Sequence, residues 1–180
     1  MKVTDVSFLL LIVGASALAW VVRRLAGGRP GLRWAMRWGM GLGFVFTGVD
    51  HFVNAQLRYV PMIPDLLAAQ ALFWVYLTGA AELAGGLALL APQRLLDRLG
   101  MPRLHKLAGL GLAALLVCVV VANVHVAQQG QQVHGLPFGA WYYWVRPLLQ
   151  PVFILWALYC SGVWAGFARG AVAADAGGGR

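Results

Sequence analysis

The fold of this chain is decided by Tyr76-Leu77-Thr78-Gly79-Ala80-Ala81-Glu82-Leu83-Ala84-Gly85-Gly86-Leu87-Ala88-Leu89-Leu90, a stretch with a single charged side chain. Such a stretch predicts a membrane-spanning helix with Glu82 near its middle. A charge at that depth costs about 2.5 kcal/mol or more, so an intramembrane carboxylate indicates a functional site. Gly79, Glu82 and Gly86 are spaced by three and four residues and share one helix face. We therefore expect Glu82 to face other helices, which the small residues allow to approach closely.

The composition is that of a polytopic membrane protein built from α-helices. Of the 180 residues, 61% are hydrophobic and 11% are charged, and the mean hydropathy is +0.72, which does not fit a soluble domain. The formal net charge of +8 is expected to face anionic lipid, because the chain lacks basic, aromatic-rich patches of the kind that bind nucleic acid. Cys118 and Cys160 lie in separate apolar runs without a Cys-x-x-Cys pair, so neither a disulfide relay nor a metal site is predicted.

Five apolar stretches approach the roughly 20 residues that a helix needs to cross a bilayer. They cover residues 6–22, 34–52, 67–91, 107–127 and 148–168. The segment Ala17-Leu18-Ala19 resembles a signal-peptidase site, but cleavage there would leave five arginines on the translocated side. We therefore expect the first helix to be retained. The Gly-rich tail, residues 169–180, is expected to be disordered.

The distribution of basic residues predicts the orientation of these helices. Of the 14 Lys and Arg residues, 11 fall in the connections after the first and third stretches or in the C-terminal tail, and 3 fall on the other side. The positive-inside rule therefore places the N-terminus outside and the C-terminus in the cytoplasm, across a bacterial inner membrane. Five helices agree with this arrangement, because an odd number of spans puts the two termini on opposite sides.

With this orientation, the hydrogen-bonding side chains gather in the outer half of the membrane domain. The candidate ligand-binding residues are His51, Tyr76, Glu82, Asn123, His125 and Arg146. The same half also holds Asp50, Arg58, Asp65, Thr78 and Gln150. Imidazoles and buried carboxyl groups can exchange protons when their environment tunes them, so the cluster favours a ligand site. We expect Glu82 to be protonated there, because desolvation disfavours the charged form.

Each candidate also has a purely structural interpretation. A histidine at the position of His51 or His125 can simply meet water at the membrane interface, and Arg146 can anchor its helix there. Asn123 can bond a neighbouring helix, and Tyr76 can serve packing. Glu82 is the hardest to explain in this way, because its depth excludes a solvated surface.

Several short motifs, in this order, resemble the DoxX family of small bacterial membrane proteins. The motifs are His51-Phe52, Pro61-Met62-Ile63-Pro64, Val75-Tyr76-x-Thr78-Gly79-x-x-Glu82-Leu83-x-Gly85-Gly86, Ala122-Asn123-Val124-x-Val126 and Arg146-Pro147-Leu148-x-Gln150. The resemblance implies a four-helix membrane bundle over residues 34–168. Residues 1–33 would then add one N-terminal transmembrane helix and its basic connection. The resemblance also implies a redox accessory role, because family members are linked to quinol oxidase and oxidative-stress complexes.

We therefore expect an accessory or quinone-interacting subunit of a membrane redox system, with an apolar slot open to the outer leaflet. The alternative is a non-catalytic assembly protein that binds a protein partner or forms a homo-oligomer. Haem held by His51 and His125 is less favoured, because nothing in their spacing demands it. A transporter acting alone is disfavoured by the small size and the lack of an inverted repeat. The sequence leaves open whether the protein is an enzyme, and which reaction or partner it serves.

Overall fold

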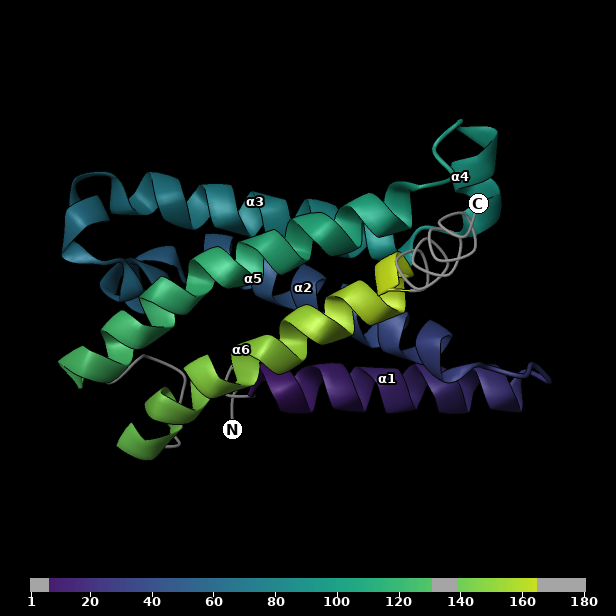
Figure 1. Cartoon of the computed structure of the whole chain (residues 1–180), viewed down its shortest axis with the longest axis horizontal. Helices are drawn as coiled ribbons and strands as arrows, with labels where there is room; N and C mark the ends of the chain where they lie inside the picture. The colour runs from purple at the N-terminus through teal and green to yellow at the C-terminus, as the bar shows by residue number, and fades with distance from the viewer. Residues whose placement is uncertain (1–6, 131–138, 165–180) are drawn as a thin grey trace, which may run out of the picture.

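The structure is a computed structural model that describes residues 7–130 and 139–164, and all regular elements in these ranges are helical. Five long helices run roughly along the long axis of the molecule (Figure 1). They are α1 (Phe8–Leu25), α2 (Leu32–Val53), α3 (Ala71–Leu90), α5 (Leu104–Gln129) and α6 (Ala140–Ser161). Each corresponds to one of the five predicted apolar stretches, so the all-helical fold class is confirmed.

The described residues contain three helical segments that are long and apolar enough to cross a membrane. These segments are Phe8–Leu25, Asp65–Leu90 and Leu104–Gln129. The other two long helices, α2 and α6, contain charged and amide side chains such as Arg37, Asp50, Arg146 and Gln150 within their length. These polar groups lower the hydropathy of α2 and α6. The three apolar segments indicate a membrane protein.

Short elements fill the connections at both ends of the bundle. The π-helix η1 (Ala55–Tyr59) and the 3₁₀ helices η2 (Val60–Met62) and η3 (Asp65–Gln70) lie between α2 and α3. The sequence did not predict the short helix α4 (Gln93–Arg98), which lies in the basic connection after α3 at the opposite end (Figure 1). We call these two ends of the bundle the η end and the α4 end.

The last long helix begins earlier than the sequence predicts. It starts at Ala140, whereas hydropathy placed its start at residue 148. Pro147 and Pro151 lie inside α6, and the helix continues through both. Prolines are tolerated in membrane helices because neighbouring groups satisfy the freed carbonyls. The tail 169–180, predicted to be disordered, lies outside the described residues.

Glycines bring the backbones of α2 and α3 close together. Gly41 on α2 faces Gly86 on α3, and Gly48 on α2 faces Gly79 on α3. The two glycines on each helix are one heptad apart in the sequence. A Cβ atom at Gly86 would lie 2.8 Å from the Gly41 carbonyl oxygen, and one at Gly48 would lie 3.0 Å from that of Gly79. The predicted role of Gly79 and Gly86 in helix contact is therefore confirmed. This close seam places side chains of α2 directly beside those of α3.

Apolar side chains from all five long helices form one core between them. Its buried members are Ile12, Met40, Phe44, Leu89, Ala108, Leu112, Leu116, Phe153, Ala157 and Cys160. The core occupies the middle and the α4 end of the bundle. The polar candidates of the sequence lie beyond it, toward the η end.

Side chains of α2 and α5 cap two helix ends at the α4 end. Arg33 Nε donates to the carbonyl oxygen of Cys160, at 3.4 Å, near the end of α6. His105 Nε2 lies 2.9 Å from the Ala91 carbonyl at the end of α3, so Nε2 must carry the proton. His105 Nδ1 then accepts from Arg37 Nη1, at 2.7 Å. The two arginines, Arg33 and Arg37, lie where the partial negative charge of helix C-termini favours cations.

Candidate functional site

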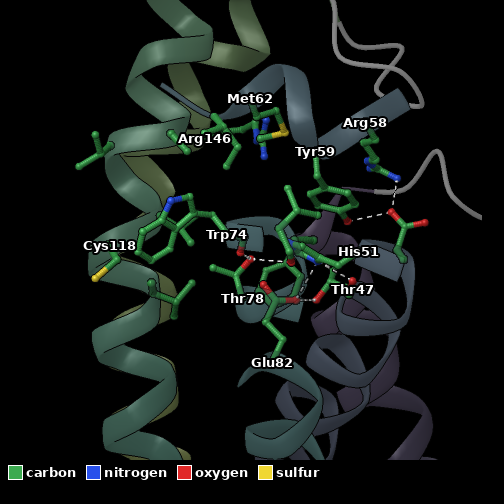
Figure 2. Close-up of a pocket in the computed structure, with 18 of the residues that line it drawn as sticks. Thr47, His51, Arg58, Tyr59, Met62, Trp74, Thr78, Glu82, Cys118 and Arg146 are labelled. Carbon is green, nitrogen blue, oxygen red and sulfur yellow. Dashed lines mark hydrogen bonds and ion pairs between the residues drawn. The ribbon is translucent and has the colours of Figure 1, made fainter. Parts of the chain in front are cut away.

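A cavity of about 350 Å³ lies between the long helices, toward the η end (Figure 2). Its lining comes from α1, α2, α3, α5, α6 and the connection between α2 and α3, and most of it is apolar. The polar and sulfur-containing members of the lining are Thr47, Asp50, His51, Arg58, Tyr59, Met62, Trp74, Thr78, Glu82, Cys118, Tyr142, Arg146 and Gln150. An apolar chamber with a few convergent polar groups is the usual form of a small-molecule site.

Glu82 forms the floor of the cavity together with Thr47. The hydroxyl of Thr47 lies 2.6 Å from Glu82 Oε2 and joins α2 to α3. It also lies 3.2 Å from the Gly43 carbonyl of its own helix. A hydroxyl has one proton but can also accept, so both charge states of Glu82 are satisfied. A carboxylate accepts from Thr47, whereas a carboxylic acid donates to Thr47, which then donates to Gly43.

His51 lies one turn after Thr47 on α2 and completes this polar wall. Its Nδ1 is 2.8 Å from the Thr47 carbonyl oxygen, which can only accept, so Nδ1 carries a proton. The same nitrogen lies 3.6 Å from Glu82 Oε2. The imidazole stacks on the ring of Tyr59, with centroids 3.7 Å apart and planes inclined by 25°. A neutral His51 therefore has Nε2 as its acceptor.

Asp50 organises a second polar group above His51, at the η end. Its Oδ2 accepts from Arg58 Nη1 at 2.9 Å and from the Tyr59 hydroxyl at 2.8 Å, and its Oδ1 accepts from Asn54 Nδ2 at 2.5 Å. Burial and the nearby Asp50 carboxylate raise the pKa of Tyr59 above its usual range. These bonds hold η1 against the end of α2 and thereby fix Tyr59 on the His51 ring.

Two polar atoms of α6 are buried without a hydrogen-bond partner among the described residues. They are Arg146 Nη1 and Gln150 Oε1, and both residues line the cavity. Figure 2 shows Arg146 beside Met62, on the side of the cavity away from Glu82. Buried polar groups are nearly always hydrogen-bonded, so an orphaned donor and an orphaned acceptor need an explanation. A bound ligand or water would satisfy them.

The structure brings three of the six predicted candidates together. His51, Glu82 and Arg146 line the cavity. Tyr76 does not; it is 39% exposed and stacks on Phe52. Asn123 is buried outside the lining with an unpartnered Oδ1, and His125 is partly buried outside it. The six candidates were grouped because they lie at a similar depth along their helices. Side chains at one depth point in different directions around a helix, so a similar depth does not bring them into one site.

Sequence reasoning missed the importance of Thr47 and Tyr59. Thr47, Asp50 and His51 are spaced by three and four residues, so their common helix face was a signal that was available. Tyr59 had no such signal, because its contact with His51 depends on how η1 folds back.

In the described ranges no three His, Cys, Asp or Glu side chains lie close enough together to hold a metal ion.

Comparisons with known proteins identify a family but no activity. The model of a family described as a domain of unknown function (DUF8561) matches residues 40–161, more than half of the chain. The match runs from α2 to the end of α6 and so includes every long helix of the cavity except α1. No curated protein and no solved structure matches the chain. No DoxX family model matches it either, so that resemblance stays a prediction.

Proposed function

This chain belongs to the DUF8561 family, and we propose that it is an integral membrane protein whose cavity binds a quinone as part of a membrane redox system. In the proposed arrangement all five long helices span the membrane. The long helices α2, α3, α5 and α6 form a DoxX-like four-helix bundle over residues 34–168, and α1 adds a span at the N-terminus. The N-terminus lies outside and the C-terminus in the cytoplasm of a bacterial inner membrane, as the 11 basic residues on one side favour.

The observation that carries the proposal is the pair of polar groups at opposite sides of a mostly apolar cavity, called poles below. One pole is Glu82 with Thr47 and His51, and the other is Arg146 with its unpartnered Nη1. A quinone ring has two carbonyl oxygens on opposite sides and an apolar body between them. The ring would pack on the apolar lining while each carbonyl accepts a hydrogen bond from one pole.

The two poles would have different roles in quinone chemistry. Reduction of a quinone to a quinol takes up two electrons and two protons; the electrons would come from a redox protein that binds this chain. Glu82 can release a proton to a ligand oxygen and regain one through Thr47 or His51, which lie 2.6 Å and 3.6 Å away. Arg146 cannot supply a proton in this way, but its guanidinium stabilises negative charge on the second oxygen.

Binding and proton exchange are separated by two variants. Decylubiquinone is titrated into the protein in nanodiscs, and binding is followed by quenching of tryptophan fluorescence. We expect saturable quenching, weakened about 10-fold or more by Arg146→Met, because one buried hydrogen bond to a charged donor is lost. Glu82→Gln should bind nearly as well but should fail to support quinone reduction in cells. Absence of saturable quenching, together with no quinone in lipid extracts, would overturn the proposal.

A non-catalytic assembly role is the second candidate, and one observation favours it. Glu82 already has a partner in Thr47, so an interhelical hydrogen bond accounts for it without any ligand. In that case the bundle would serve as a docking unit for a protein partner. Glu82→Gln would then retain full function in cells, because glutamine preserves the bond to Thr47.

A further inference from the structure

We propose that the cavity opens sideways into the bilayer, between α3 and α5. Its ligand would be an amphiphile dissolved in the membrane, whose tail leaves through this opening. The identity of the ligand's head group rests on the proposed function; the opening itself rests on the geometry of the cavity wall.

The exposed part of the cavity lining belongs to two elements, α5 and the η3 helix that leads into α3. Leu67, Cys118 and Val121 are the lining residues in the described ranges that are exposed. Cys118 and Val121 lie on α5, and Leu67 lies in η3, which leads into α3. Val121 is 62% exposed although it also lines the cavity. A side chain that meets both the interior and the surface marks a mouth.

This mouth faces hydrocarbon rather than water. The exposed lining residues are apolar or sulfur-containing, and Val121 lies inside the segment Leu104–Gln129, which is apolar enough to span a membrane. It precedes the last residue of α5 by two turns, roughly 12 Å along the helix axis. Water at the membrane surface would therefore reach it less readily than lipid chains do.

The seam between α3 and α5 is weakly tied near the mouth. Its hydrogen bond among the described residues is at the α4 end, from His105 to the Ala91 carbonyl. Thr78, which lines the cavity, donates to its own helix, at 2.9 Å from the Trp74 carbonyl. Figure 2 shows the Trp74 indole between α5 and the polar floor at Glu82. Since no hydrogen bond between described residues joins α3 to α5 in this part of the wall, a rotation of Trp74 would widen it.

The size of the cavity explains why a tail must remain outside. Its volume of about 350 Å³ is near the lower limit of ligand pockets, about 300 to 1,000 Å³. A single substituted ring fills such a space. A long alkyl or isoprenoid chain therefore has to pass between α3 and α5 into the lipid. The apolar chain is already out of water there, so it needs no pocket in the protein.

The opening can be tested without any ligand. Thr78→Cys in a Cys118→Ala, Cys160→Ala background places one thiol inside the cavity behind the mouth. In proteoliposomes at pH 8.5 we expect it to react with pyrene maleimide, which dissolves in lipid, and to resist a charged, membrane-impermeant maleimide. Adding Val121→Phe should slow the pyrene reaction at least 5-fold, because the ring fills the mouth. Val117→Phe is the matched control: Val117 is 56% exposed on the same helix but does not line the cavity.

The results separate the opening from the identity of the ligand. Faster labelling by the charged reagent, no labelling by either reagent in the folded protein, or equal rates for the two phenylalanine variants would overturn the opening. Decylubiquinone is then added as a competitor. Protection of the Thr78→Cys thiol supports both proposals. Normal labelling without protection leaves the opening supported and counts against a quinone as the ligand.

Discussion

The hydroxyl of Thr47 lies 2.6 Å from Glu82 Oε2, and this contact joins α2 to α3 in the interior of the bundle. It is flanked by Gly48 and Gly79 on one side and by Gly41 and Gly86 on the other, where the two backbones come closest. The glycines thus bring the helices near enough for two short polar groups to meet. Neither Thr47 nor Glu82 could reach the other across a seam of large side chains.

The first prediction concerns the energy of this contact. Replacing either residue by an apolar one, Thr47→Val or Glu82→Leu, should lower the free energy of unfolding, and the two changes should not be additive. We expect a coupling energy of about 0.5 to 2 kcal/mol, the range found for neighbouring residues and interhelical hydrogen bonds in membranes. Unfolding of the single and double variants in mixed detergent micelles measures it. His125→Ala serves as the control for Glu82→Leu, because His125 lies outside the cavity, and that pair should be additive.

The second prediction concerns the glycine seam. Gly86→Ala should lower the free energy of unfolding by about 1 to 3 kcal/mol, because the new methyl group would meet the backbone of α2 at Gly41 and Val45. Gly111→Ala on α5 is the control, since nothing lies within 4 Å of its Cβ position. It should be neutral or stabilising by up to about 1 kcal/mol through helix propensity. Equal melting temperatures for the two variants would contradict the close packing of α2 on α3.

The third prediction separates two arginines that hydropathy treats alike. Arg37→Ala should destabilise by about 1 to 3 kcal/mol, because it leaves the buried Nδ1 of His105 without its donor. Arg33→Ala should change stability by no more than about 0.5 kcal/mol, because Arg33 is exposed and its bond to Cys160 is long. Thermal unfolding in detergent compares the two variants. A larger effect at Arg33 would mean that positive charge, and not the His105 contact, stabilises this end.

The fourth prediction concerns alkaline pH. Because the pKa of Tyr59 is raised in the folded protein, folding favours the neutral phenol. Its contribution to stability is present below the ordinary tyrosine pKa of 10.0 and is lost as the pH rises above that value. Tyr59→Phe should therefore be less stable than the wild type at neutral pH, where the bond to Asp50 is lost, and less sensitive between pH 10 and 11. Ultraviolet difference titration of the two proteins should show no Tyr59 ionisation near pH 10; a normal titration there would refute the buried hydrogen bond.

The fifth prediction concerns orientation. A phosphatase reporter that works only in the periplasm, fused after Arg169, should be inactive, and a fluorescent protein fused at the same position should fold. The 11 basic residues expected on the cytoplasmic side supply the physical reason. The reciprocal fusions within the η end, after Gln56, provide the control. A periplasmic signal after Arg169 would reverse the orientation and place the cavity near the cytoplasmic leaflet.

The long helices and the direction in which Glu82 faces could be predicted from the sequence alone. Apolar runs of sufficient length specify membrane helices, because the backbone must satisfy its own hydrogen bonds in lipid. The spacing of Gly79, Glu82 and Gly86 then follows from the helical repeat, and it put the carboxyl group against another helix, where Glu82 is 8% exposed. These features depend on neighbours along the chain, so they can be read without knowledge of the fold.

Which side chains meet could not be predicted, because it depends on how the helices pack against one another. Thr47 reaches Glu82, and Tyr59 covers His51, because α2 and α3 have particular rotations about their axes and η1 folds back over the end of α2. The rotations of α3 and α5 likewise keep Tyr76 and His125 out of the cavity lining, and the rotation of α6 brings Arg146, whose Nη1 has no partner among the described residues, into it. Hydropathy fixes how deep a residue lies but not the direction in which it points around the helix. That direction is set by packing between helices, through contacts that are distant in sequence.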